Sequence, residues 1–455
     1  MISLPALSIC NIVQGKLISG PSDRLASGGV CTDSRKIIPH SVFFALGGEN
    51  FDGNSFAPEA SQAASVVVVS QIAPGIDPSC AVILVDHVLE ALQLLATWWR
   101  NQLNNLTVVG LTGSNGKTST KDFTAAIFRE AGKTTATLGN LNNHIGVPLS
   151  ILQATPEDQF AIWEMGMNHA GELLPLCKMV QPKFGIITSI GTSHIEFLGT
   201  REAIAEEKCT LAHSLPKMGA LAYPAHCDFA AYIESCTDAA LLSVGIEQGV
   251  VQAKNLQASA TGTTFTLCIP NWEEIELFIP VQGEHMVCNA LLAAAIAWKA
   301  GLTPEMIAKG LKNTTLTAGR LHCKVIKGIT IIDDTYNANP DSMKAALKTL
   351  KDMPTTGKRI AVLGKMGELG HFSDKGHTLV GQEAQKLHID QVITIGNEAS
   401  RISEAIIQGS KTHALHFNDA DQAADWIKEH VVAGDIILFK GSRSARMELL
   451  MNNCF

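Results

Sequence analysis

The sequence has neither a long apolar run nor an excess of positive charge. No segment approaches the roughly 18 apolar residues that a membrane-spanning helix needs, so we expect no membrane span. The formal net charge is −8, which gives no general basic surface for nucleic acid or anionic lipid. We therefore expect no nucleic-acid partner, and any polyanionic ligand must be bound by local groups.

The eleven cysteines lack the spacing of a zinc site or a disulfide framework. They are spread from Cys10 to Cys454 without a Cys-x-x-Cys pair or a neighbouring pair of histidines. Reduced, mostly buried thiols are typical of a cytosolic protein. The first residues also lack a basic region and a long apolar run, so we expect a cytoplasmic location.

Length and pattern predict an α/β protein of three domains. We expect a small N-terminal domain over residues 1–103, a central phosphate-loop-type domain with a mostly parallel sheet over 104–318, and a C-terminal doubly wound, Rossmann-like domain over 319–455. Strands are expected near 42–46, 65–69, 81–85, 106–111, 160–164, 184–189, 220–223, 263–267, 275–279, 329–333, 359–363, 391–395 and 435–439. Helices are expected near 88–103, 119–130, 201–215, 285–300, 341–351, 376–387 and 419–431.

A glycine-rich turn lies between a β-branched run and a helical pattern. Its sequence fits Gly-x-x-x-x-Gly-Lys-Ser/Thr except that Leu111 stands at the first glycine. Backbone N–H groups and a helix N-terminus would bind phosphates there, while Lys117 reaches the terminal phosphates and Thr118 binds Mg²⁺. We expect a nucleoside triphosphate; a structural glycine turn and a dinucleotide-binding turn are the alternatives. The candidate nucleotide-binding residues are Gly113, Ser114, Asn115, Gly116, Lys117, Thr118 and Ser119.

Two further expected strands end near residues that suit a metal–phosphate site. The strand near 160–164 ends at Glu164, and the strand near 184–189 leads to His194. Ligands of open α/β sheets bind beyond the carboxyl ends of the strands, so a carboxylate and an imidazole would meet the triphosphate there. Alternatively, Glu164 starts a helix and His194 is an ordinary loop residue.

Lys208 falls within the apolar stripe of its expected helix, together with Ile204, Leu211 and Leu215. The side chain either extends its ammonium to solvent or is held without water near the metal site. On another helix, His285 and Asn289 share a face, where they either contact a purine base or bond helix-start amides.

Two polar stretches also offer groups that could bind a nucleotide. Thr32–Lys36 and Phe51–Asn54 bring hydroxyl, guanidinium and turn backbone together. Taken alone, the first stretch equally suits a solvated loop. In the last domain, Asp333–Pro340 is a dense polar cluster after a strand, and Gly364–Gly370 is a second glycine turn.

Several of these segments resemble the Mur ligases, the ATP-dependent ligases of peptidoglycan precursor synthesis. Thr112–Thr118 is similar to the ATP loop of that family, which also lacks the first glycine. Gly139–Pro148 and Glu164–Glu172 resemble forms found in the last-step ligase. Thr32–Lys36 with Phe51–Gly53 resembles its uridine-diphosphate-binding domain. The resemblance covers the whole chain.

The resemblance implies an enzyme that uses ATP to join D-alanyl-D-alanine to UDP-N-acetylmuramoyl-tripeptide through an acyl phosphate. It implies two Mg²⁺ ions, one bound by Thr118 and Glu164, the other by His194 and a carbamylated Lys208. The catalytic residues would be Lys117, His194, Lys208 and Asn337. Further contacts to adenosine and phosphates would come from Asn289, Arg320 and Asp334. The uridine-linked substrate would be bound by Ser34, Arg35, Phe51, Asn140, Asn142 and Asn143.

The sequence departs from the family pattern in two places and lacks a motif of one sibling enzyme. Met286 stands where the family usually has Asn, and Lys365 stands where we expect an acidic residue. An Asp-Asn-Pro-Arg motif is absent, which favours the dipeptide-adding enzyme over the ligase for the third peptide residue. A sibling ligase, including folylpolyglutamate synthase, and a nucleotide-dependent switch ATPase remain alternatives.

Overall fold

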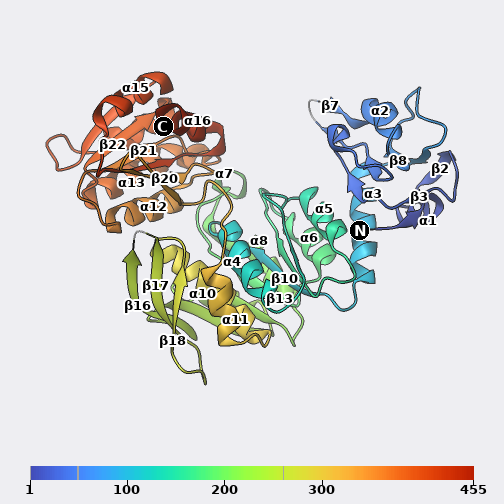
Figure 1. Cartoon of the computed structure of the whole chain (residues 1–455), viewed down its shortest axis with the longest axis horizontal. Coiled ribbons are helices and arrows are strands. Elements are labelled where there is room, and N and C mark those ends of the chain that lie inside the picture. Colours follow the sequence, from blue (N-terminus) through green and yellow to red (C-terminus); the bar gives the residue numbers. More distant parts are fainter. Residues whose placement is uncertain (1, 49–50, 260) are drawn as a thin grey trace. The chain divides into compact units, whose positions relative to one another are not determined.

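The computed structural model describes residues 2–48, 51–259 and 261–455 (Figure 1). The chain forms two compact units. The first contains Met1–Gly110, Gly132–Met167 and Glu172–Lys183, and the second contains Leu111–Ala131, Asn168–Gly171 and Phe184–Phe455. The domain boundaries expected near residues 103 and 318 remain a prediction.

The first unit contains a five-stranded sheet in the order β2-β9-β8-β5-β4. Its β8 consists of four valines that are all buried, as expected for a parallel strand covered on both faces. The strands are β2 (Lys16–Ser19), β4 (Val30–Cys31), β5 (Val42–Phe44), β8 (Val66–Val69) and β9 (Ala81–Leu84), and the helices are α1 (Ala6–Ile12), α2 (Ala57–Ser61) and α3 (Val88–Gln102). Two short ribbons pair β1 (Leu4–Pro5) with β3 (Leu25–Ala26) and β6 (Gly47–Gly48) with β7 (Phe51–Asp52).

A nine-stranded sheet follows the order β11-β12-β10-β13-β14-β15-β16-β17-β18. The pairings from β13 to β16 are parallel, with Phe184 opposite Ala220, and those of β17 with β16 and β18 are antiparallel. The strands are β10 (Thr107–Thr112), β11 (Thr134–Ala136), β12 (Phe160–Glu164), β13 (Phe184–Ile187), β14 (Ala220–Pro224), β15 (Ala240–Ile246), β16 (Val251–Ser259), β17 (Gly262–Cys268) and β18 (Ile275–Ile279). The sheet is therefore mostly parallel, as expected.

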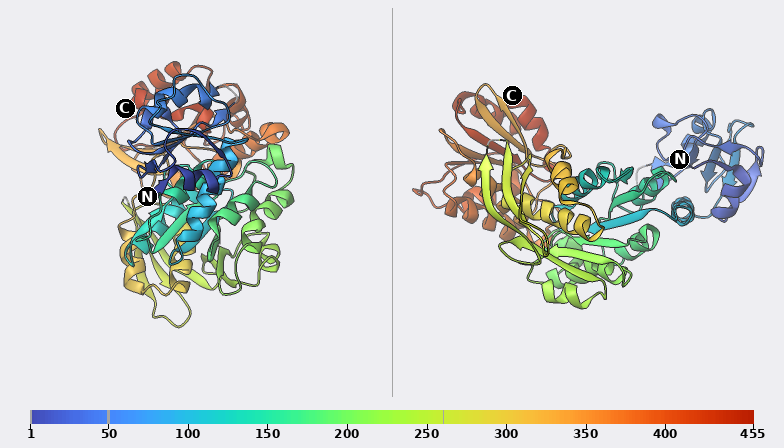
Figure 2. Two further views of the ribbon diagram at one scale, coloured as in Figure 1. Left: turned by 90° about the vertical axis from the view of Figure 1, so that its right-hand side faces the viewer. Right: turned by 60° about the horizontal axis from the view of Figure 1, so that its bottom comes forward.

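The helices of this region cover the buried strands. In the second unit, α10 packs on β14, β15 and β16, and α11 packs on β18 (Figure 2). Thr303 caps the helix α11, and Pro304 is its first residue, where a proline loses no helical hydrogen bond. The helices are α4 (Lys117–Arg129), α5 (Gly146–Gln153), α6 (Leu173–Val180), α7 (Ile195–Leu198), α8 (Arg201–His213), α9 (Ala230–Ser235), α10 (Glu284–Lys299) and α11 (Pro304–Lys312).

The C-terminal part of the second unit is a six-stranded sheet in the order β19-β20-β24-β21-β22-β23. Only its edge pair β19–β20 is antiparallel, and helices lie on both faces (Figure 1). The strands are β19 (His322–Ile326), β20 (Ile329–Asp334), β21 (Arg359–Leu363), β22 (Gln391–Ile395), β23 (His413–Phe417) and β24 (Ile436–Lys440). The helices are α12 (Pro340–Asp352), α13 (Ser373–Lys386), α14 (Ser400–Glu404), α15 (Ala420–His430) and α16 (Met447–Cys454). This arrangement confirms the doubly wound α/β class.

The sequence pattern missed several strands, among them β15, β16, β19 and β23; the exposed positions of β16 are mostly polar, and those of β23 are two histidines. Among the residues that the structure describes, none of the helices combines the length and apolar character that crossing a bilayer requires.

Candidate active site

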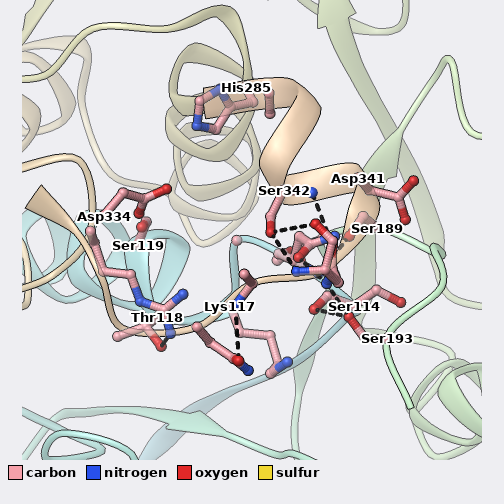
Figure 3. A pocket seen from close by; sticks show the side chains of 18 of the residues that line it. Ser114, Lys117, Thr118, Ser119, Ser189, Ser193, His285, Asp334, Asp341 and Ser342 are labelled. Atoms are coloured by element: carbon pink, nitrogen blue, oxygen red, sulfur yellow. Dashed lines mark hydrogen bonds between the residues drawn. The ribbon is translucent and has the colours of Figure 1, made fainter. Parts of the chain in front are cut away.

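A cavity of about 1300 Å³ lies within the second unit, where its two sheets deliver their loops (Figure 3). It is large enough for a nucleotide and a second ligand, since typical ligand pockets measure roughly 300–1,000 Å³. Many of the residues that the sequence indicates line this cavity, although they lie far apart along the chain. They are Ser114, Asn115, Gly116, Lys117, Thr118, Ser119, His194, Asn289, Arg320, Asp334 and Asn337.

The phosphate loop has the backbone that its glycines allow. Gly113 and Gly116 have φ angles of 151° and 82°, which side chains rarely adopt. A Cβ at Gly113 would also collide with the hydroxyl of Thr188, and a Cβ at Gly116 would lie 2.5 Å from the Asn289 amide oxygen. Asn289 therefore packs directly against the loop, and no larger residue than glycine fits at either position.

The neighbouring loop after β13 fixes the amides at the start of the phosphate loop. The N–H of Ser114 donates to the Ser189 carbonyl over 2.9 Å, and the N–H of Asn115 donates to the Ser189 hydroxyl over 2.8 Å. The Lys117 ammonium lies 2.7 Å from the carbonyl of Gly113 (Figure 3). The first turn of α4, whose amides have no partner within the helix, is thus the part of the loop suited to an anion.

Arg320 brings a guanidinium to the same helix start. Its Nη2 lies 3.5 Å from the Thr118 hydroxyl, and its guanidinium stands 4.0 Å from the centre of the Tyr336 ring. The Nε of Arg320 is buried and has no hydrogen-bond partner among the described residues. A buried donor without an acceptor is costly, so an anionic ligand at Thr118 would complete this arrangement.

A buried ion pair closes another wall of the cavity. The ammonium of Lys440 lies 2.6 Å from the Asp334 carboxylate and donates to the Asn337 carbonyl over 3.0 Å. Burial lowers the pKa of Lys440, and Asp334 opposes that shift. Lys440 directly follows the strand expected near 435–439, so the strand-end argument that indicates Glu164 also applies to Lys440, which the sequence analysis does not name.

His285 and Asn289 both line the cavity. Burial lowers the pKa of His285 to about 4, so its ring is neutral at physiological pH. The helix α10 follows Gly283, which has no side chain to cap it, and both interpretations of His285 and Asn289 stay predictions. The Nδ2 of Asn289 contacts the sulfur of Met286 at 3.6 Å, which places Met286 beside the cavity as well.

His194 is paired with a carboxylate that the sequence analysis did not select. Its Nδ1 lies 2.6 Å from the Glu368 carboxylate, and this bond holds the pKa of Glu368 below its usual range. Both residues have left-handed backbone, with φ angles of 63° and 59°, which is uncommon for residues other than glycine and clusters at functional sites. The signal for Glu368 was its place in the glycine turn Gly364–Gly370.

The start of α12 contacts the phosphate loop and its neighbour. The Nδ2 of Asn339 donates to the Asn115 side chain over 2.7 Å and to the Ser193 hydroxyl. The carboxylate of Asp341 accepts from the N–H and the hydroxyl of Thr192 over 3.0 and 3.1 Å. Two loops of the nine-stranded sheet are thereby bonded to the C-terminal sheet.

Lys208 is buried, with 1% of its surface exposed. The interpretation that its ammonium extends to solvent is therefore wrong. Burial holds the pKa of Lys208 well below its usual value, and the positive charge of Lys117 adds to this effect while Glu207 opposes it. Both effects favour the neutral amine.

Glu164 belongs to the first unit, where it is the last residue of β12 and not a helix start. Its Oε1 accepts from Asn142 over 2.6 Å, while its buried Oε2 has no partner among the described residues. Asn143 accepts from the N–H of Gly146 over 2.8 Å at the start of α5. Over the residues described, no cluster of three or more His, Cys, Asp or Glu suits a metal ion; the expected ligands include only two residues of those types.

The N-terminal polar stretch forms a short 3₁₀ helix, Ser34–Lys36, capped by Asp33. The Arg35 guanidinium lies 2.8 Å from the Asp33 carboxylate and lowers the pKa of Asp33 to about 2. The Arg35 side chain is 84% exposed, and Phe51 is 56% exposed. Within the first unit, these side chains are accessible to a ligand.

The family was identified by comparison with known proteins. The Mur ligase middle domain matches residues 111–297, and the Mur ligase glutamate ligase domain matches residues 319–443. The UDP-N-acetylmuramoyl-tripeptide–D-alanyl-D-alanine ligase of Bacillus subtilis is 36% identical over 456 residues, with 100% of this chain and 98% of the relative covered. The chain belongs to the Mur ligase family.

The other relatives agree with this assignment. The Escherichia coli ligase of the same name is 34% identical, with 98% of this chain and 97% of the relative covered. A crystal structure of MurF from Acinetobacter baumannii superposes with a TM-score of 0.91 at 32% identity, covering 100% of this chain and 99% of that one. MurF from Thermotoga maritima in complex with ADP has a TM-score of 0.83 at 26% identity, covering 94% and 96%.

Proposed function

We propose that this Mur ligase uses ATP to join D-alanyl-D-alanine to UDP-N-acetylmuramoyl-tripeptide. The observation that carries the proposal is the cavity where the phosphate loop meets the loops of the C-terminal sheet. The names of relatives that are 34–36% identical over nearly the whole chain support the substrates. We also propose a cytoplasmic location for this enzyme.

The reaction has two steps. The free carboxylate of the tripeptide attacks the γ-phosphate of ATP, and the bond between the γ-phosphorus and the bridging oxygen breaks. ADP departs, and the tripeptide is now an acyl phosphate. The amine of D-alanyl-D-alanine then attacks the acyl carbon, and the tetrahedral intermediate expels phosphate and loses a proton to give the peptide bond. The protein's main task is to position reactants and neutralise phosphate charge.

Four features of the cavity fit that task. The first-turn amides of α4 and Lys117 would bind the terminal phosphates, with Gly113, Ser114, Asn115, Gly116 and Ser119 shaping the loop. Arg320 would neutralise charge beside Thr118. Its buried Nε, which lacks a hydrogen-bond partner in the part of the chain that the structure describes, supports this role. Asn289 and the Asp334–Lys440 pair would line the part of the cavity that binds the adenosine. Asn337, whose carbonyl accepts from Lys440, would face the reacting groups.

Mg²⁺ would supply further charge neutralisation at the phosphates. Its ligands would be Thr118 and Glu164 for one ion, and His194 with Lys208 for the other. Glu164 fits the role because its second oxygen is buried and has no hydrogen-bond partner over the described ranges of the chain. Lys208 fits after reaction of its neutral amine with CO₂, which forms an N–C bond, releases a proton and leaves a carbamate anion.

The uridine-linked substrate would be bound in the first unit. Ser34, Arg35 and Phe51 offer a hydroxyl, a guanidinium and an aromatic face, and Arg35 and Phe51 are exposed. Of the expected residues on the loop after β11, Asn142 would act through Glu164, and Asn140 and Asn143 would contact the substrate.

An ADP-release assay with a panel of acceptors tests this proposal. D-alanyl-D-alanine should support turnover in the presence of the uridine-linked tripeptide, while single amino acids and glutamate should not. Release driven by glutamate or by one amino acid would favour a sibling ligase, and release without any acceptor would favour a switch ATPase.

A further inference from the structure

Asp122 is a largely buried carboxylate of α4 that the proposed reaction does not use. It lies one helical turn after Thr118 and faces the segment that leads into the C-terminal sheet. Its Oδ2 accepts from the N–H of Thr317 over 2.8 Å and from the Thr317 hydroxyl over 2.9 Å. Its Oδ1 lies 2.7 Å from the Lys121 ammonium, and the Asp122 side chain is 11% exposed. Such charge-assisted bonds fix the carboxylate in one orientation.

The segment that Asp122 holds ends at Arg320. Gly319 has a φ angle of 74° and packs against Tyr336, whose N–H lies 3.3 Å from the Gly319 carbonyl. Arg320 then returns to the same helix, because its Nη2 lies 3.5 Å from the Thr118 hydroxyl. The helix α4 therefore contacts both ends of this segment: Asp122 contacts Thr317, and Thr118 contacts Arg320.

We propose that Asp122 is a positioning residue that sets the place of the Arg320 guanidinium at the phosphate loop. Asp122 does not line the cavity, so it acts through Thr317 and the short segment that follows. With Thr317 fixed, few residues of chain remain to move Arg320, because each residue spans at most about 3.6 Å. Without this anchor, Arg320 keeps its charge but loses its fixed approach to the phosphates. The inference rests on the proposed role of Arg320 toward ATP.

A double-mutant cycle separates this role from a structural one. We expect Arg320→Ala to lower kcat/KM for ATP by on the order of 10²-fold, as for other preorganised charge-stabilising groups. We expect Asp122→Ala to lower it about tenfold, as a partial loss of the same stabilisation. The variant with both changes should match Arg320→Ala within about twofold, because Asp122 acts only through Arg320. A further tenfold loss in the double variant would overturn the proposal.

The cycle can also be run with a milder variant. Thr317→Val removes the hydroxyl bond and leaves the Asp122–Lys121 pair in place, so it decides the question if Asp122→Ala does not fold. Its effect on kcat/KM should have the same direction and should vanish in the Arg320→Ala background. An unchanged kcat/KM in Thr317→Val would contradict the proposal.

Glu130→Gln provides the matched control. Glu130 lies at the end of α4 and pairs with Lys309 of α11 over 2.7 Å, away from Arg320. This variant should keep kcat/KM within about twofold of the wild type, and its small effect should multiply with that of Arg320→Ala. Non-additivity here would show that any loosening of α4 disturbs Arg320, which would also overturn the proposal.

Binding of ATP alone keeps this inference separate from the proposed reaction. The same cycle should be measured by calorimetry on the dissociation constant for ATP, without peptide substrates. A protein that binds ATP but releases no ADP with both substrates would refute the proposed reaction, while the binding cycle would still decide the role of Asp122.

Discussion

The Nδ2 of Asn339 donates to the Asn115 side chain over 2.7 Å, although the two residues are 224 positions apart. The same nitrogen donates to Ser193, so one amide joins the start of α12 to the phosphate loop and to the loop before His194. The Oδ1 of Asn339 meanwhile accepts from the N–H of Ser342 over 2.9 Å and caps α12. Asn339 thus has a capping side and a side that contacts the site.

Asn339→Asp separates these two functions. An aspartate still caps α12 through an oxygen but cannot donate to Asn115 or Ser193, and its charge lies near the phosphates. We expect kcat to fall about 10–10²-fold, the lower part of the range for one misplaced active-site group, with little change in thermal stability. Asn339→Ala should lower both, since loss of a cap costs about 1 kcal/mol. Normal turnover in a folded Asn339→Asp variant would refute a role in the site.

Lys117→Ala removes a charge that we expect at the transferring phosphoryl group. The variant should fold normally and lose on the order of 10²–10³-fold in kcat. Circular dichroism and steady-state ADP release check the two parts of this expectation. Near-normal turnover would show that the phosphate loop does not take part in catalysis.

Arg35→Ala should affect the uridine-linked substrate and not ATP. The guanidinium is exposed in the first unit, and a bond to a phosphate there would contribute to substrate binding far from the reacting carboxylate. We expect KM for the uridine-linked tripeptide to rise about tenfold, equivalent to one charge-assisted bond. The dissociation constant for ATP is the internal control, and a change in that constant would show that the ligand sites are wrongly assigned.

Lys208→Ala tests the proposed carbamate. The variant should lose most of the ligation rate, and acetate should restore part of that rate by replacing the lost carboxylate. Depletion of bicarbonate should lower the ligation rate of the wild type. The control is Lys217→Ala, because Lys217 follows α8 but is 81% exposed and pairs with Asp238. An active Lys208→Ala variant, or one that acetate does not help, would contradict the carbamate.

His285 should make stability depend on pH. Its pKa is about 4 in the folded protein and 6.5 in the unfolded chain, so the unfolded chain binds more protons between these values. Its contribution to stability is therefore complete above pH 6.5 and is lost as the pH falls to 4, by up to about 3 kcal/mol. His285→Gln should reduce the difference between the melting temperatures at pH 7 and pH 4.5. An equal effect from the exposed His413→Gln would contradict this assignment.

Much of the fold could be predicted because the decisive signals are local. The run Phe160–Glu164 is β-branched and aromatic enough to form a strand, and Thr303-Pro304 marks a helix start by its own chemistry. The strand His413–Phe417 was missed because its two histidines break the apolar pattern, although its neighbours in the sheet make it a strand.

The site was predictable only where a motif or a strand end carried it. The phosphate loop, which lines the cavity, follows from such a signal, and the role of Glu164, which follows from a strand end, stays a prediction. The partners of Asn339, Glu368 and Lys440 depend on how distant segments pack. Lys208 shows the same limit, because its spacing indicated an apolar helix face but could not distinguish burial from exposure to solvent.

The proposed ligation consumes ATP only when both peptide substrates are present. The most direct test is ADP release by the purified protein with Mg²⁺, ATP, UDP-N-acetylmuramoyl-tripeptide and D-alanyl-D-alanine, each substrate being omitted in turn, with the product identified by mass spectrometry. We expect stoichiometric ADP and UDP-N-acetylmuramoyl-pentapeptide with the complete mixture, and no ADP release when either peptide substrate is omitted. Steady ADP release without the peptide substrates, or ADP release without a pentapeptide product, would contradict it.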